Sequence, residues 1–208
     1  MRVLELFAGT QSVGKEFRSR GHEVVSLDLE AGTRPTICCD ILEWDYQAAF
    51  PPGHFDVIWC SPPCTEYSKA KTTAPRNLEL ADRIVTRTLQ ILAYFCPHYF
   101  YLENPQTGLL KTRQMMAGIP FHDCTYCSYG RPFRKATRLW HNTPWRPRPM
   151  CDRKTCPQVV DGRHKQTAQR APGKLRSGVR MSGDIVSLDE LHALPPDLVR
   201  ELADAVGA

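Results

Sequence analysis

Residues 55–64 read FDVIWCSPPC, an apolar run that ends in a serine, two prolines and a cysteine. A short run of β-branched and aromatic residues closed by turn residues is typical of a buried strand. Four further runs of this kind stand in the chain, namely RVLELFAG (2–9), HEVVSLDL (22–29), TICCDI (36–41) and HYFYLEN (98–104). Helical spacing is found between them, in SVGKEFRSRG (12–21) and LELADRIVTRTLQILAYF (78–95). Strands that alternate with helices predict an α/β fold with a parallel sheet.

The size and composition of the chain restrict its class. Its 208 residues, 42% of them apolar and 24% charged, suit one ordinary globular domain. The first residues, MRVLELFAG, lack the basic-then-apolar layout of a secretory signal, and no apolar run approaches membrane-spanning length. Nine cysteines are an odd number, so they cannot all pair within the chain. We therefore expect a cytoplasmic monomer with reduced thiols and no membrane segment.

Charge is concentrated in one part of the chain. Residues 131–180 hold fourteen lysines and arginines against two acids, Asp152 and Asp161, a local excess of +12. The whole chain carries +5, so the remainder carries about −7. A solvated charged loop is the simpler interpretation. A basic segment on an acidic body nevertheless favours a polyanionic partner that approaches from one side.

Small and acidic residues follow the predicted strands at the edge where parallel sheets bind ligands. The turn FAGTQS (7–12) is rich in small residues, which let a ligand approach the backbone, and it leads into a helix N-terminus. Asp28 and Asp40 follow the second and third strands, where an acid can hold ribose hydroxyls or face an adenine. Together these features predict a cofactor of the adenosyl type.

Cys64 stands at the end of the fourth strand, behind Pro62 and Pro63, which stiffen the turn and give the thiol a defined direction. A buried thiol without chemistry is the usual state of cysteine. We expect that state for the cysteines in apolar surroundings, Cys38, Cys39, Cys60 and Cys96. The polar residues TEYS directly after Cys64 favour a nucleophile there instead.

Glu103 lies at the end of the otherwise apolar strand HYFYLEN. A buried acid needs a partner or takes a raised pKa, and a raised pKa suits a general acid. A thiolate and a protonated carboxyl beside one pocket can add a nucleophile across a conjugated ring while a ring nitrogen is protonated. The pair Cys64 and Glu103 therefore predicts covalent chemistry on a heteroaromatic ring.

The motifs LFAG, PPC-x-x-x-S and EN, in this order and on these strands, resemble the DNA (cytosine-5)-methyltransferase family across about residues 1–140. The sequences ENP and YG-x-P-x-x-K-x-T-x-x-W-x-N and the short basic segment are similar to its compact phage and prophage members. The resemblance implies a Rossmann-like, S-adenosylmethionine-dependent methyltransferase sheet with a short basic, Cys/His-containing target-recognition segment. It also implies DNA as the partner.

The same resemblance implies a role for each matching residue. Cys64 would attack C6 of a cytosine that has left the base stack, while Glu103 protonates N3 and the methyl group enters at C5. Lys135 falls on the first of two arginine positions of the family and Arg138 lies beside the second, so both are candidates for contacting the base. The residues implied for the cofactor are Phe7, Ala8, Gly9, Gln11, Ser12, Asp28, Leu29, Asp40, Ile41 and Pro62.

The organisation along the chain follows from these assignments. We expect a catalytic domain at 1–140, a small DNA-recognition segment at 141–182 and a C-terminal helix within 183–208 that packs back on the catalytic domain. The segment is rich in proline and basic residues and lacks helical or strand periodicity. Its short length suggests limited sequence specificity, or a partner that supplies specificity.

Other functions stay open from the sequence. A catalytically degenerate homologue could bind DNA without turnover, since the first turn reads GTQS where the family is usually richer in glycine. The tripeptide SPP (61–63) is also part of the signature of methyltransferases that act on exocyclic amino groups, and RNA cytosine is a third possible substrate.

A structural zinc ion is predicted for the basic segment, because the segment lacks the apolar residues for a core of its own. Five ligands are available for four places: Cys124, Cys127, Cys151, Cys156 and His164. We favour Cys127, Cys151, Cys156 and His164, since three of them lie in the segment and Cys127 ends the strand that leads into it. The alternatives are the two pairs Cys124/Cys127 and Cys151/Cys156, or free thiols with an ordinary histidine.

Overall fold

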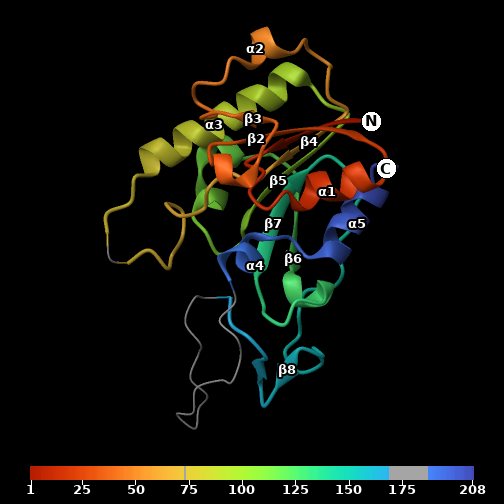
Figure 1. Ribbon diagram of the computed structural model, residues 1–208. Helices are drawn as coiled ribbons and strands as arrows, with labels where there is room; N and C mark the ends of the chain where they lie inside the picture. The colour runs from red at the N-terminus through yellow and green to blue at the C-terminus, as the bar shows by residue number, and fades with distance from the viewer. Residues whose placement is uncertain (73, 169–186) are drawn as a thin grey trace.

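A seven-stranded sheet forms the framework of the computed structural model, which describes residues 1–72, 74–168 and 187–208 (Figure 1). The strand order is β3-β2-β1-β4-β5-β7-β6. The strands are β1 (Arg2–Leu6), β2 (Glu23–Asp28), β3 (Ile37–Cys38), β4 (Val57–Cys60), β5 (Tyr99–Pro105), β6 (Phe121–Thr125) and β7 (Ala136–His141). The predicted α/β class is confirmed.

Five neighbouring strands are parallel, but the other edge of the sheet is not. β7 runs antiparallel to both β5 and β6, with Glu103 opposite Leu139. A purely parallel sheet was therefore wrong for this edge. The physical reason is the connection: residues 126–135 link β6 to β7 without a crossover helix, and a short link of this kind favours antiparallel pairing. The 3₁₀ turns η2 (Leu110–Thr112) and η3 (Gln114–Met116) lie between β5 and β6, which run in the same direction.

Helices cover both faces of the sheet (Figure 1). Alternate residues of each strand point to opposite faces, so Val3 and Val57 pack with one helical layer while Leu4 and Ile58 pack with the other. The first layer holds α1 (Ser12–Ser19) and α5 (Pro196–Asp204), and the second holds α2 (Tyr46–Ala49) and α3 (Leu78–Phe95). The remaining helical turns are η1 (Ala31–Thr33), η4 (Tyr126–Tyr129) and α4 (Leu188–His192).

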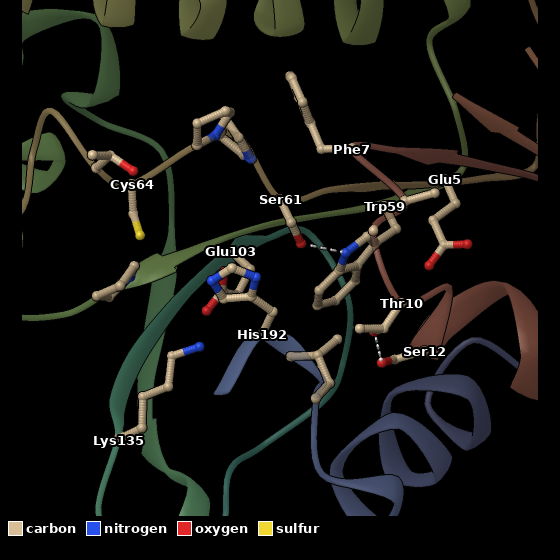
Figure 2. Close-up of a pocket in the computed structure, with 17 residues that line it drawn as sticks. Glu5, Phe7, Thr10, Ser12, Trp59, Ser61, Cys64, Glu103, Lys135 and His192 are labelled. Carbon is tan, nitrogen blue, oxygen red and sulfur yellow. Dashed lines mark hydrogen bonds between the residues drawn. The ribbon is translucent and has the colours of Figure 1, made fainter. Parts of the chain in front are cut away.

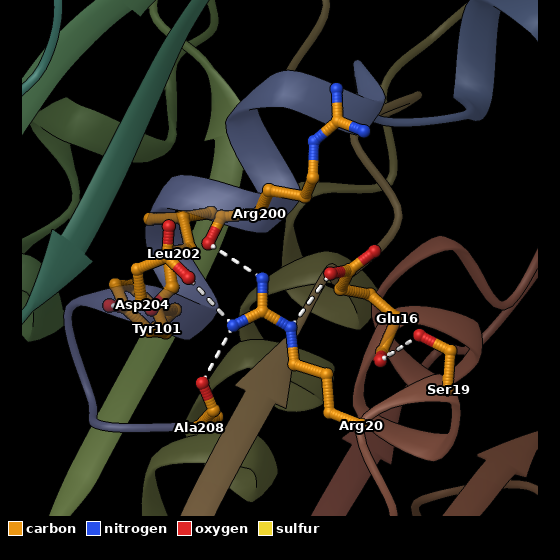
Figure 3. A network of polar contacts seen from close by, with 8 residues as sticks. All are labelled: Glu16, Ser19, Arg20, Tyr101, Arg200, Leu202, Asp204 and Ala208. Carbon is orange, nitrogen blue, oxygen red and sulfur yellow. Dashed lines mark hydrogen bonds and ion pairs between the residues drawn. The ribbon is translucent and has the colours of Figure 1, made fainter.

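The C-terminal helix α5 is joined to α1 by one arginine (Figure 3). The Arg20 guanidinium pairs with Glu16 at 2.8 Å on its own side and with Asp204 at 2.7 Å on α5. It also donates to the Ala208 and Arg200 carbonyls, at 2.7 and 3.4 Å. These contacts hold α5 beside α1, and residues just before α5 share a pocket with the carboxyl end of β1.

Residues 142–168 contain little regular structure. The only strands that the structure describes there are β8 (Val159–Val160) and β9 (Arg163–His164), which form a two-residue ladder. This hairpin was not expected, because two residues are too few for a periodic signal. The expected boundary at 182 lies outside the described residues. No helix in the described part of the chain is long and apolar enough to cross a membrane.

Candidate active site

A pocket of about 280 Å³ opens beyond the carboxyl ends of β1, β4 and β5 (Figure 2). Cys64, Glu103 and Lys135 come from three separate parts of the chain and line it together. Its other lining residues come from β1 and the turn after it, from β4 and the segment after it, from the end of β5 and from the C-terminal segment: Glu5, Phe7, Ala8, Gly9, Thr10, Ser12, Trp59, Ser61, Pro62, Pro63, Thr65, Pro105, His192 and Leu194. The structure thus places three of the residues that were predicted to be catalytic in one pocket.

Strand register explains which side chains reach this pocket. Glu5 pairs with Trp59 across β1 and β4, so both side chains leave the sheet on the same side. Glu103 lies two residues beyond Tyr101, the partner of Trp59 on β5, and therefore points to that side as well. The pocket lies on the α1/α5 side of the sheet, where these three side chains meet the C-terminal segment.

The loop that carries Cys64 is held by polar contacts, one of them buried. Asn104 donates its side-chain amide to the Pro62 carbonyl at 2.9 Å, which ties the loop to β5 next to Glu103. The Trp59 indole donates to the Ser61 hydroxyl at 2.7 Å, and the Tyr67 amide donates to the Cys64 carbonyl at 3.1 Å. The thiol is consequently held at the strand end, partly exposed, with its sulfur toward the pocket (Figure 2).

Glu103 is a buried acid with few partners. Burial raises its pKa, and the nearby Lys135 ammonium and a long 3.5 Å hydrogen bond from the Tyr126 hydroxyl offset only part of that rise. Burial, and then the charge of Glu103, raise the pKa of the Cys64 thiol, which Lys135 lowers. Each group is therefore most readily ionised when the other is neutral, and Lys135 is the cation that favours ionisation of both.

Lys135 and Arg138 differ in where their charges lie. The Lys135 ammonium stays at the pocket, 3.0 Å from the Leu191 carbonyl and over the ring of Tyr126. Arg138 lies outside the pocket lining, because its guanidinium makes two hydrogen bonds with Asp123, at 2.7 and 2.9 Å. Its guanidinium also stacks on Phe121. Arg138 is therefore held in a structural contact along the edge of the sheet.

The turn after β1 adopts an unusual backbone. Phe7, Gly9 and Gln11 all have positive φ, at 59°, 46° and 55°. Only glycine enters this region without strain, so Gln11 needs support. Its side-chain amide donates to the Thr33 and Arg34 carbonyls, at 2.7 and 3.0 Å. These bonds stabilise the strained turn despite its departure from a glycine-rich sequence.

A second, wider cavity adjoins the first, because Gly9, Thr10 and His192 line both. Gln11 and Asp28 line this second cavity. The Asp28 carboxylate accepts hydrogen bonds from the Gly9 and Glu30 amides, at 2.7 and 2.9 Å. It thereby joins the end of β2 to the turn after β1.

The other residues predicted for the cofactor lie outside the lining of both cavities. Leu29 is 65% exposed, next to Asp28 at the end of β2. Ile41 is buried in the core of the α3 side, and the Asp40 carboxylate accepts a hydrogen bond from the Leu42 amide at 2.9 Å. An adenine contact by Ile41 would therefore use its main chain.

Several lining residues were missed by sequence reasoning. Glu5 is buried, and burial raises its pKa to about 7 while the Val13 and Gly14 amides oppose the shift. A Cβ on Gly14 would collide with the Glu5 carboxylate, which explains a glycine inside α1. The isolated acid in RVLEL was a readable signal for Glu5. No such sequence signal pointed to His192, since only the tertiary packing of the C-terminal segment brings it to the pocket.

Comparisons with known proteins agree with this geometry. No family model matches the chain. A protein of Frog virus 3 (isolate Goorha) described as "Probable DNA (cytosine-5)-methyltransferase" is 32% identical over 224 aligned residues, which cover 98% of this chain and 99% of the viral protein. The chain belongs to the DNA (cytosine-5)-methyltransferase family. The resemblance drawn from its motifs is confirmed.

A solved structure is similar to this family member in fold. It is a "putative DNA modification methyltransferase" encoded within a prophage of E. coli, with a TM-score of 0.51 and 12% sequence identity. The likeness covers 77% of this chain and 56% of that one, so the present chain spans little more than half of the larger protein. At this identity the comparison concerns the fold alone, and it agrees with the predicted α/β sheet.

The cysteines of this family member fall into distinct groups. Cys127, Cys151, Cys156 and His164 gather with their ligand atoms all within 4.8 Å of one another. Cys124 is fully buried in the core and is not part of the group. Cys127 lies in η4 rather than at the end of a strand, because β6 ends two residues earlier. Two of the cysteines expected to be buried, Cys38 and Cys96, are exposed.

Arginines of the basic segment also divide into two kinds. Arg148 pairs with Glu201 at 2.7 Å and stacks on Tyr129, so it joins this segment to α5. Arg134 and Arg153 are exposed and border a cavity of about 460 Å³ with Arg163. We call this site the arginine cavity; its lining is Arg134, Arg153, Arg163, His164, Gln166, Thr167 and Ala168. Four further basic residues, at 170, 174, 176 and 180, lie outside the described residues.

Proposed function

We propose that the chain transfers a methyl group from S-adenosylmethionine to C5 of cytosine in DNA. The observation that carries the proposal is the meeting of Cys64, Glu103 and Lys135 in one pocket that continues into the cavity beside the turn after β1. Family membership supports the reaction class. The rival exocyclic amino-methylation needs a carbonyl or a Ser/Asp acceptor rather than a thiol, and Cys64 stands where its aromatic residue would be.

The residues beside the turn fit an adenosyl cofactor. Gly9 brings backbone close to the point where the two cavities meet, and the Asp28 carboxylate retains acceptor capacity for ribose hydroxyls beyond its two amide contacts. The exposed Leu29 side chain offers an apolar surface for a base. When bound, S-adenosylmethionine supplies an electrophilic methyl group.

In the proposed chemistry Cys64 and Glu103 each act twice. Cys64 adds to the base and later leaves it, and Glu103 gives a proton and later takes it back. The Cys64 thiolate forms a bond to C6 of the cytosine while protonated Glu103 gives its proton to N3. The electrons displaced from the C5–C6 double bond make C5 nucleophilic toward the methyl group that S-adenosylmethionine would supply, with its sulfur leaving as a neutral thioether. Loss of the C5 proton to solvent then re-forms the double bond as Cys64 leaves, and N3 returns its proton to Glu103. Lys135 stabilises the thiolate before attack.

The substrate must approach as an extruded base, because a cytosine in a duplex cannot reach the pocket. Arg134 and Lys135 are consecutive, yet Arg134 lines the arginine cavity and Lys135 lines the active-site pocket. Adjacent Cα atoms are about 3.8 Å apart, so positive charge borders the place where the base would enter. We assign the flanking phosphates to this basic surface.

Trapping the covalent step tests the proposal directly. Incubation with S-adenosylmethionine and DNA that contains 5-fluorocytosine should give a protein–DNA adduct, because fluorine blocks loss of the C5 substituent. The adduct should disappear in Cys64→Ser and persist in the control Cys96→Ser, whose residue is exposed and does not line the pocket. DNA binding without any adduct would favour a degenerate binding protein, and an adduct formed only with RNA would reassign the substrate.

A further inference from the structure

The four ligand atoms of Cys127, Cys151, Cys156 and His164 form a site separate from the active-site pocket. We propose that they bind one zinc ion, which holds the segment 149–166, the Cys/His segment, against the catalytic sheet. This proposal does not depend on the proposed methyl transfer. None of the four residues lines the active-site pocket, so the metal would act on structure rather than on the reacting base.

The distances in the site match tetrahedral zinc. The His164 Nε2 atom lies 3.4 Å from the Cys151 sulfur and 3.6 Å from the Cys156 sulfur. A tetrahedral ion with Zn–S bonds of about 2.3 Å and Zn–N bonds of about 2.0–2.1 Å places nitrogen about 3.6 Å from each sulfur. Three thiols and one imidazole are also a usual ligand set for a structural zinc site.

Among the described residues, the Cys/His segment has little apolar packing to hold its shape. Its apolar side chains are few, and Met150 and Val160 are exposed by 40% and 54%. The β8–β9 ladder has two residues per strand, and an isolated short hairpin is marginally stable in water. Ordering such a segment costs conformational entropy that this small buried surface does not offset. Metal binding can supply that free energy.

The site also connects two distant parts of the chain. Cys127 belongs to η4, directly after β6, while the other three ligands lie in the Cys/His segment. Two hydrogen bonds from backbone amides of the segment support the same connection. The Cys151 amide donates to the Thr125 hydroxyl at 2.9 Å, and the Gln166 amide donates to the Pro132 carbonyl at 3.1 Å. The ion would thus hold the arginine cavity, which includes His164, in a defined position beside the sheet.

The first test measures metal in the whole 208-residue chain, purified under reducing conditions without metal-affinity resin. We expect about one zinc per chain by elemental analysis, and retention in Cys96→Ser. Cys156→Ser and His164→Ala should lose most of the zinc. His164→Cys should keep it, because four thiolates also bind zinc tetrahedrally, and this pair of His164 variants separates ligation from simple loss of the ring.

A second test uses the wild-type chain and so does not depend on folding of a variant. Replacement of the metal by Co²⁺ should give thiolate-to-metal charge-transfer absorption and the visible bands of tetrahedral cobalt. Chelation should make the Cys/His segment sensitive to protease while the catalytic sheet stays resistant. Metal-free protein with a protease-resistant segment would overturn the proposal, as would a disulfide between any two of the three thiols or cobalt spectra without thiolate bands.

Discussion

The active-site pocket and the Cys/His segment differ in what holds them in place. The pocket stands on strands that are buried on both faces, and Glu5, Trp59 and Glu103 are aimed by strand register. The Cys/His segment has two-residue strands and exposed apolar side chains, and its contacts with the sheet are polar. A packed sheet positions its catalytic side chains through many weak contacts, whereas a segment with little apolar core depends on a few strong ones.

The cysteines illustrate the same difference. Cys64 stands alone at a strand end beside one acid and one cation, an arrangement that suits a nucleophile. Cys127, Cys151 and Cys156 are crowded around one histidine, an arrangement that suits a metal. The residue type is identical, and its neighbours decide the chemistry. If the two regions are as separate as this comparison holds, variants in one should leave the other unchanged.

Removal of the nucleophile should have the largest effect. Cys64→Ala should abolish methyl transfer, since no other thiol lines the pocket, while binding of S-adenosylmethionine and the zinc content stay unchanged. The measurements are transfer of labelled methyl groups to DNA, calorimetric cofactor binding and elemental analysis. Residual activity above a trace would refute the covalent mechanism, and loss of zinc would refute the separation of the two regions.

Glu103→Gln should rank next. The amide keeps the shape of the side chain but cannot supply a proton, and one positioned acid contributes about 10²–10⁴-fold to rate. We expect a loss in that range with little change in cofactor affinity. Because burial raises the pKa of Glu103, wild-type activity should fall as rising pH removes this proton, and the variant should lack that decline. A rate within threefold of wild type would remove Glu103 from the mechanism.

Glu5 should make the pocket region sensitive to pH in the absence of cofactor. Its pKa is raised from 4.5 to about 7, so the folded state binds the proton more tightly than the unfolded state does. The contribution of Glu5 to the free energy of unfolding should therefore be fully present below pH 4.5 and be lost as the pH rises through about 7, a decrease of about 3 kcal/mol in total. Glu5→Gln should show a smaller decrease by denaturant unfolding. Equal pH dependence in both proteins would contradict this assignment.

The smallest effect should come from the exposed arginines. Arg134→Gln combined with Arg153→Gln should flatten the dependence of log affinity on log salt by about one unit for each phosphate group that the protein no longer neutralises. Arg83→Gln, an exposed arginine on α3 at the opposite face of the sheet, is the matched control and should leave the slope unchanged. If Arg83→Gln altered the slope and the paired variant did not, the DNA surface would lie on the other side of the molecule.

Much of the fold could be predicted because its signals are local. The alternation of apolar strands with helices is visible in the sequence, and the predicted helix at 78–95 coincides with α3. The antiparallel edge escaped prediction, because strand direction depends on which strands become neighbours and not on the apolar pattern of β6 or β7. Exposure of Cys38 and Cys96 escaped for a similar reason, since an apolar neighbour in sequence need not be a neighbour in space.

The sequence by itself determined the family and the residues at the strand ends, because a parallel sheet brings its carboxyl ends to one edge whatever its details. Only the tertiary structure decided which charged side chains are held in ion pairs and which face a pocket. It pairs Arg138 with Asp123 and Arg148 with Glu201, leaves Lys135 at the pocket, and places His192 where two cavities meet. Side-chain partners of this kind are set by packing between distant segments, and no local pattern in the chain encodes them.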